Sequence, residues 1–175
     1  MTEKQENILR AALQLFAAEG YHATPTSKVA KAAGVSEGLI FRHFGSKEGL
    51  LQGILDAGEE AGRKEIGLLL AEKDPESLLR MAIHRPFQVA EDAGQLEFWK
   101  LIYKLKYELG RTGEYGRDQL EKALASSFRK LGYAHPQKEA SFFLLHFDAV
   151  VAALVTGTLE HPRSVRNYWL AKYGL

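Results

Sequence analysis

One stretch near the N-terminus, TPTSKVAKAAGVSEGLIFRHFGSK, restricts the possible folds most strongly. Thr24 is a good N-cap residue and Pro25 suits a first helical position, so a helix is expected from there to about Ala33. Ser36 can cap a second helix in the same way. Between them, Gly34 tolerates the positive φ of a tight turn. The stretch therefore predicts two short helices that meet at a steep angle, which is the pattern of a helix-turn-helix.

Helical signals also divide the rest of the chain. Apolar residues recur at helical spacing, and no segment alternates apolar and polar residues long enough to indicate a strand. About nine helices are expected, beginning near residues 2, 25, 37, 47, 75, 95, 117, 136 and 162. Pro86 should kink or end the fifth, and a glycine-rich loop at 111–116 should precede the seventh. The expected fold class is all-α.

Composition limits the kinds of partner. The 175 residues include 23 Lys and Arg against 22 Asp and Glu, so the net charge of +1 excludes a globally basic coat for nucleic acid. The absence of cysteine excludes a disulfide scaffold. The N-terminus has no signal-peptide pattern, and the longest apolar run, 142–155, is shorter than the ~20 residues of a membrane span. A cytoplasmic protein without a membrane segment is expected.

The second helix of the motif has a side that is free to bind. At ~100° per residue, Ile40 and Phe44 lie toward the core, while Gly38, Phe41 and Arg42 lie on the opposite side. A helix with small or polar N-terminal residues can enter the major groove of DNA while flanking groups hold phosphates. The candidate phosphate-binding groups stand near two helix N-termini and are Thr24, Thr26, Ser27 and Lys47.

Charge supports the same interpretation. Between Thr24 and Lys47 the chain has four basic residues, Lys28 among them, and one acidic residue, Glu37. This local excess of positive charge suits a partner with a phosphate backbone. A helical corner with a solvated charged face is the alternative.

The segment ILRAALQLFAAEGYHATPTSKVAKAAGVSEGLIFRHFGSKEGLL resembles the DNA-binding domain of the TetR family of bacterial transcriptional regulators. The elements LFAAEGYHAT, VAKAAGVSEG and FRHFGSKEGLL occur in the family's order. The resemblance covers the first third of the chain; the remainder agrees with the family in helical pattern and length. It implies a dimeric regulator, usually a repressor, whose C-terminal helical domain binds a small molecule and changes the separation of two recognition helices.

The resemblance also implies roles for single residues. By position, Ser36, Glu37, Gly38 and Leu39 would face bases, while Phe41, His43 and Lys47 would line the phosphates. Phe41 stands where the family commonly has tyrosine, so a hydroxyl contact to phosphate is missing. Leu39 favours apolar contact with a thymine methyl group. Glu37 either accepts a hydrogen bond from cytosine N4 or repels phosphate and sets the orientation of the helix.

Two helices near the C-terminus are the candidates for a dimer interface. A single helix-turn-helix reads few base pairs, so selective DNA binding requires two copies about one DNA turn apart, ~34–36 Å. The eighth helix, FFLLHFDAVVAALVTG, is apolar on nearly every face, and the ninth contributes Val165, Tyr168, Trp169 and Leu170. The expected interface is a four-helix one, with a wholly buried helix in a monomer as the alternative.

A small-molecule site should be concave and mostly apolar, with a few polar groups. The sixth helix is apolar around most of its circumference and should be largely buried. The candidate ligand-binding residues, for each of which plain core packing is the alternative, are His84, Phe87, Phe98, Trp99, Ile102, Tyr103, Phe143, His146 and Phe147.

The sequence gives no sign of catalysis. Its six histidines include no pair three or four residues apart, so no helical metal site is expected, and no cofactor-binding or nucleophile motif is present. The expected organisation is a helix-turn-helix DNA-binding domain at 1–47 and a helical ligand-binding and dimerisation domain at 48–175.

The expected function is that of a ligand-responsive repressor. It would bind an inverted-repeat operator as a homodimer and be released by a small, largely apolar molecule. The alternative is a ligand-binding or protein-interaction module in which the helix-turn-helix is structural only, an alternative that Glu37 and Phe41 favour.

Overall fold

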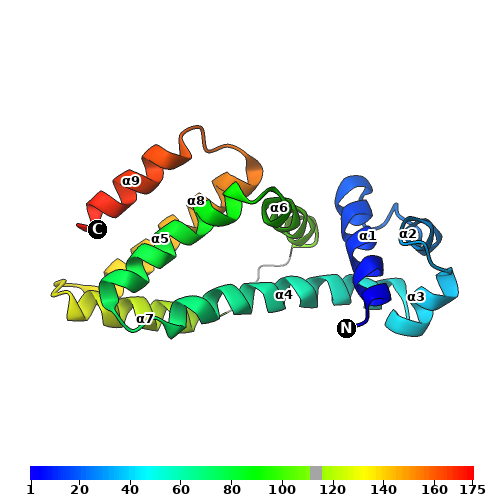
Figure 1. Cartoon of the computed structure of the whole chain (residues 1–175), viewed down its shortest axis with the longest axis horizontal. Coiled ribbons are helices and arrows are strands. Elements are labelled where there is room, and N and C mark those ends of the chain that lie inside the picture. The colour runs from blue at the N-terminus through cyan, green and yellow to red at the C-terminus, as the bar shows by residue number, and fades with distance from the viewer. Residues whose placement is uncertain (111–115) are drawn as a thin grey trace. The chain divides into compact units, whose positions relative to one another are not determined.

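A computed structural model describes residues 1–110 and 116–175, and all of their regular structure is helical (Figure 1). The expected all-α class is confirmed. Of the glycine-rich loop predicted at 111–116, all but Gly116 lies outside the described residues. The helices of the described residues are α1 (Glu3–Glu19), α2 (Thr26–Ala32), α3 (Glu37–Phe44), α4 (Lys47–Ala71), α5 (Pro75–Glu91), α6 (Ala93–Glu108), α7 (Arg117–Lys130), α8 (Pro136–Thr156) and α9 (Pro162–Lys172).

The chain forms two compact units. Unit 1 comprises the described residues of 1–61 and 101–113, and unit 2 those of 62–100 and 114–175. The sequence suggested a division after residue 47, but the first half of α4 belongs to unit 1. At Gly53 of α4 an added Cβ would lie only 3.1 Å from Leu9 and 3.2 Å from Phe44, so only a very small residue fits between these side chains.

In unit 1, α1 begins with a capping box in which Thr2 and Gln5 bond each other's backbone N–H groups, at 3.3 and 2.8 Å. Its apolar stripe buries Ile8 and Phe16 completely. Contacts run from α1 to α2 and from α2 to α3. Gly34 adopts a φ of 66° between α2 and α3, as the turn requires.

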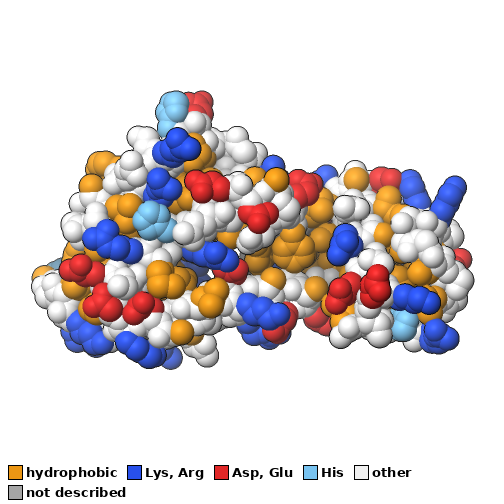
Figure 2. Space-filling model, viewed as in Figure 1, with side chains coloured by type: hydrophobic (Ala, Val, Ile, Leu, Met, Phe, Trp, Pro, Cys, Tyr) orange, Lys and Arg blue, Asp and Glu red, His pale blue; other side chains and the backbone are white. Residues whose placement is uncertain are grey.

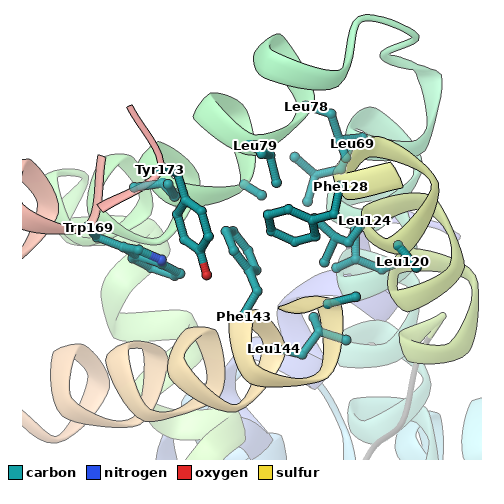
Figure 3. Packing of buried hydrophobic residues seen from close by; sticks show 14 of the residues in the cluster. Leu69, Leu78, Leu79, Leu120, Leu124, Phe128, Phe143, Leu144, Trp169 and Tyr173 are labelled. Carbon is teal, nitrogen blue, oxygen red and sulfur yellow. The ribbon is translucent and has the colours of Figure 1, made fainter. Parts of the chain in front are cut away.

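Unit 2 is built around a cluster of aromatic side chains, which we call the aromatic cluster: Phe128, Tyr133, Phe143, Trp169 and Tyr173. Phe143 lies between Trp169 and Tyr173 on one side and Phe128 on the other (Figure 3), with ring centroids 4.9, 5.7 and 6.2 Å away. The cluster draws on α7, the connection from α7 to α8, α8 and the α9 region, and α5 packs against all three of these helices. Ring contacts of this kind add to the stability that burial of apolar surface provides.

Of the two outcomes predicted at Pro86, an end of α5 is wrong, and so is the predicted burial of α6. The helix α5 does not end at Pro86 but continues to Glu91, with Pro86 buried. The helix α6 is not largely buried: only Ile102 and Leu105 are, and Tyr107 is 83% exposed. One face of α6 is covered because Ile102 packs against α4 at Gly58, where an added Cβ would lie 3.1 Å away. The other residues of α6 are half-buried or exposed.

The helix α8 is the one described helix long and apolar enough, by length and composition alone, to cross a membrane. Ala140, Phe143, Leu144 and Val150 of this helix are buried in the core of unit 2, as in the central helix of a globular protein. Its Asp148 pairs with Arg117 of α7. Yet Phe142 is 54% and Leu145 65% exposed, so α8 is not wholly buried in one copy of the chain, and that alternative is wrong.

Candidate DNA-binding site

The helix α3 has one fully buried residue and exposes the side of the helix opposite to it. Ile40 is its only buried residue, while Glu37, Gly38, Phe41 and Arg42 are exposed. Figure 2 shows lysine and arginine side chains (blue) standing out over α2 and α3. The face opposite Ile40 is the one that the sequence predicted to be free.

Thr24 is not part of this surface. The sequence made it the N-cap of α2, but Pro25 occupies that position and α2 begins at Thr26. The Thr24 side chain is fully buried, and its hydroxyl donates to the carbonyl oxygens of Gly20 at 2.9 Å and Leu15 at 3.4 Å. Because these carbonyls lie at and just before the end of α1, Thr24 stabilises the exit from that helix. It is unavailable to a phosphate, and its assignment as a DNA contact is corrected accordingly.

Thr26 and Glu37, both candidate DNA contacts, are bonded to each other. The Thr26 hydroxyl donates to Glu37 Oε1 at 2.6 Å. Thr26 is the first residue of α2 and Glu37 the first residue of α3, so the bond joins the N-terminal ends of the two helices. Thr26 is only 9% exposed. Each of the two residues therefore has a hydrogen-bond partner within the chain, in addition to any contact with DNA.

Lys47 is positioned by an aromatic side chain that sequence reasoning missed. Its ammonium lies 4.7 Å from the centre of the Tyr21 ring and 3.3 Å from the carbonyl oxygen of His22. Tyr21 in turn donates to Glu48 at 3.3 Å, and burial, followed by the Glu48 charge, raises the pKa of its hydroxyl. The segment LFAAEGYHAT contained the signal, since Tyr21 and His22 lie in it. Lys47 is thus a fixed cation at the start of α4.

The remaining candidates vary in how freely they can reach a partner. Lys28 makes a surface ion pair with Glu19 at 2.6 Å, and such pairs are easily exchanged for another anion. Ser36 is exposed at the N-cap of α3 without a side-chain cap bond. Ser27 is also exposed, Phe41 is 45% exposed, and Leu39 and His43 are half-buried.

The candidate ligand-binding residues are divided between the two units. Phe143 belongs to the aromatic cluster, and His146 lies edge-on to Trp169 with centroids 4.5 Å apart. Burial, together with the Lys172 charge, lowers the pKa of His146. In unit 1, Ile102 is a core residue and Tyr103 is exposed. The others are half-buried residues of unit 2: His84, Phe98, Trp99 and Phe147.

Unit 2 does contain a cleft, and of those candidates only Phe87 lines it. The lining is mostly apolar and consists of Phe87, Ala90, Glu91, Leu154, Pro162, Arg163 and Arg166. Arg166 Nε is buried without a hydrogen-bond partner in the described chain, and Nη1 lies 3.9 Å from Glu91. Burial, then the charges of Arg166 and Arg80, lower the pKa of His84. Arg163 and Arg166 lie one turn apart at the start of α9. They were not among the candidate ligand-binding residues expected from the sequence.

Among the described residues, no group of three or more His, Asp or Glu side chains is arranged to hold a metal ion.

Comparisons with known proteins agree with this geometry. A family model described as bacterial regulatory proteins, tetR family, matches residues 8–54. A nucleoid occlusion factor, SlmA, from Vibrio atlanticus (strain LGP32) is 36% identical over 161 residues, which are 91% of this chain and 81% of that protein. That similarity extends through both units.

Solved structures share the fold. A TetR-like transcriptional regulator from Rhodococcus sp. RHA1 superposes with a TM-score of 0.68 at 17% identity, over 96% of this chain and 92% of that one. FadR from Bacillus subtilis, in complex with stearoyl-CoA, gives 0.64 at 19% identity, over 95% of each chain. The helix-turn-helix, its family match and the relative that is similar through both units together show that the chain belongs to the TetR family of bacterial transcriptional regulators, which bind DNA and are not enzymes.

Proposed function

We propose that the protein is a repressor that binds an inverted-repeat operator as a homodimer in the cytoplasm and is released by a small molecule. The observation that carries the proposal is the exposure of one side of α3: Ile40 is its only buried residue, while Gly38, Phe41 and Arg42 are exposed. Ser36, Gly38 and Leu39 would face bases, while Lys47 and Ser27 would contact phosphates.

The proposed dimer uses α8 and α9. Phe142 and Leu145 on α8 and Tyr168 on α9 are all more than half exposed, and the exposed fraction of Tyr168 is 76%. Large apolar side chains exposed together mark interaction surfaces. A two-fold dimer would present two copies of α3, and a palindromic operator would match that symmetry.

The proposed effector site is the cleft in unit 2. Its apolar walls suit an apolar molecule, and the unpaired Nε of Arg166 suits a hydrogen-bond acceptor such as a carboxylate or hydroxyl oxygen on that molecule. FadR from Bacillus subtilis, which was crystallised with stearoyl-CoA, has the same fold. A fold that binds a ligand there supports a ligand site in this chain. The effector would favour one separation of the two α3 helices. The free energy of this shift can be no larger than the difference between the effector's binding free energies for the two states.

Selection of bound fragments from a random DNA pool at ~0.1 M salt tests the proposal, since this salt partly suppresses nonspecific phosphate attraction. An enriched inverted repeat is the expected result. The matched control is Lys122→Gln, which removes an exposed lysine of α7 and should select the same repeat. If folded protein, stripped of small molecules by denaturation and refolding, enriches no sequence, the structural-module alternative replaces the repressor.

A second candidate follows from the Vibrio relative, whose name assigns it to nucleoid occlusion. The observation that favours this candidate is the 36% identity over both units, since a shared DNA-binding domain alone would give similarity to the first unit only. Mapping the bound sites along the chromosome separates the two. A repressor should occupy few sites beside promoters, whereas a nucleoid factor should occupy many dispersed ones.

A further inference from the structure

The bond between Thr26 and Glu37 has a consequence for how α3 reads DNA. Glu37 is the only acidic residue between Thr24 and Lys47, and it lies on the helix proposed to enter the major groove. A carboxylate there would repel phosphates unless it were held away from them. In the structure its Oε1 is turned to the nearly buried hydroxyl of Thr26, at 2.6 Å.

We propose that Thr26 is a positioning residue that holds the Glu37 carboxylate at the N-terminus of α2, so that this charge stays away from the phosphates and does not read a base. The proposal rests on the DNA-binding function proposed above. It replaces both sequence-based roles of Glu37, because it assigns the carboxylate to an internal partner.

Three physical features support the arrangement. An ionised carboxylate makes a stronger hydrogen bond than a neutral acceptor. The carboxylate belongs to the first residue of α3 and is bonded to the first residue of α2, and the N-terminal ends of helices favour negative charge. Thr26 is a β-branched residue with few χ1 rotamers, and at 9% exposure its hydroxyl cannot turn freely toward solvent. The pair is therefore a restrained link between two helices that are otherwise joined by a short turn.

The Thr26 hydroxyl should therefore determine how strongly the Glu37 charge affects DNA binding. In Thr26→Val the shape is retained but the donor is lost, so the carboxylate is released toward the DNA. Binding to the selected operator should weaken about fivefold, within the range of coupling between contacting residues. Adding Glu37→Gln should restore affinity to within about twofold of the wild type, because the released group is then neutral.

Two further variants complete the design. Thr26→Ser keeps the hydroxyl and should bind like the wild type. Glu37→Gln alone keeps an oxygen acceptor, so its base preference should be unchanged. Ser27→Ala, at the exposed neighbour, is the control: its effect should be the same whether residue 37 is Glu or Gln.

The measurement is the affinity of each folded variant for the operator and for single-base variants of it. The proposal is overturned if Thr26→Val binds like the wild type, if Glu37→Gln fails to rescue it, or if Glu37→Gln shifts the preference at one base pair from cytosine to adenine, as a base-reading glutamine would. These outcomes differ from failure of the proposed function, in which the wild type itself selects no operator. Thermal unfolding of the same four Thr26 and Glu37 variants, without DNA, should show non-additive effects of the two sites.

Discussion

The two units use their aromatic residues for different purposes. In unit 2, five rings from α7, the α7–α8 connection, α8 and the C-terminal region contact one another in a continuous cluster, and Phe128 and Phe143 are fully buried. In unit 1, the buried Phe16 and Tyr21 rings meet edge to face at 5.2 Å, and the Lys47 ammonium lies over Tyr21. Phe41 in the same unit remains 45% exposed.

This difference shows where stability and binding are concentrated. Unit 2 has a large aromatic core that a change of one side chain should disturb strongly. Unit 1 uses two rings to fix one cation and leaves α3 open. Changes in the two units should therefore separate a loss of stability from a loss of DNA binding.

The largest effect is expected at the centre of the aromatic cluster. Phe143→Ala should lower the free energy of unfolding by about 3–5 kcal/mol, because it removes a buried ring and leaves a cavity. Denaturant unfolding followed by far-UV circular dichroism measures it. The control is Leu68→Ala, at a 56% exposed position of α4 in unit 2, and similar losses for both would contradict the assigned core.

The next effect concerns the exposed face of α8. Leu145→Glu places a charge in the proposed interface, so sedimentation should show a shift from dimer to monomer and operator affinity should fall at least about tenfold. Tyr107→Glu, at an 83% exposed position of α6, is the control and should leave the dimer intact. A dimer that withstands Leu145→Glu would place the interface elsewhere.

A smaller effect is expected from the cation of unit 1. Lys47→Gln should weaken binding to all DNA sequences by about fivefold and reduce the slope of log affinity against log salt by about one, because one phosphate contact is lost. Binding titrations at several salt concentrations measure both quantities. A change confined to one base position would show that Lys47 reads sequence instead. Leu39→Ala is the complementary variant, and it should relax selectivity at one position.

The smallest effect is a dependence of stability on pH that belongs to unit 2. Burial lowers the pKa of His146 in the folded chain, so the unfolded chain binds a proton more readily. Stability is therefore complete above the unfolded pKa and decreases as pH falls from about 7 to about 5. The free energy of unfolding of the His146→Gln variant should fall less over this range than that of the wild type. That of the exposed control, His135→Gln, should fall as much as that of the wild type. Unfolding at each pH checks this.

Sequence signals predicted the helices well where the signal was local. Asp74 caps α5 by accepting from the Ser77 N–H at 2.8 Å, and Ser46 caps α4 by accepting from Gly49 at 3.0 Å. Pro136 and Pro162 begin helices as expected. Each of these signals acts within a few residues, so the printed sequence contains all of it.

Features that depend on the folded arrangement were not predictable in this way. Thr24 looks like a cap residue, but its hydroxyl serves the end of the preceding helix. The Thr26–Glu37 bond joins residues eleven positions apart, across a turn whose geometry the sequence only outlines. Phe142 and Phe143 are chemically identical neighbours, and only the packing of α8 decides which is buried. The cleft of unit 2 gathers residues from α5, α8 and α9, so the two arginines of α9 alone did not reveal it.

The most direct test of the central claim, that unit 1 reads DNA as one half of a symmetric pair, is a titration with two duplexes. One carries the selected inverted repeat, and the other has one half-site scrambled. We expect two protomers to bind the intact repeat, with at least about tenfold higher affinity than the scrambled duplex. Equal affinity for the two duplexes, with one protomer bound to each, would contradict the claim.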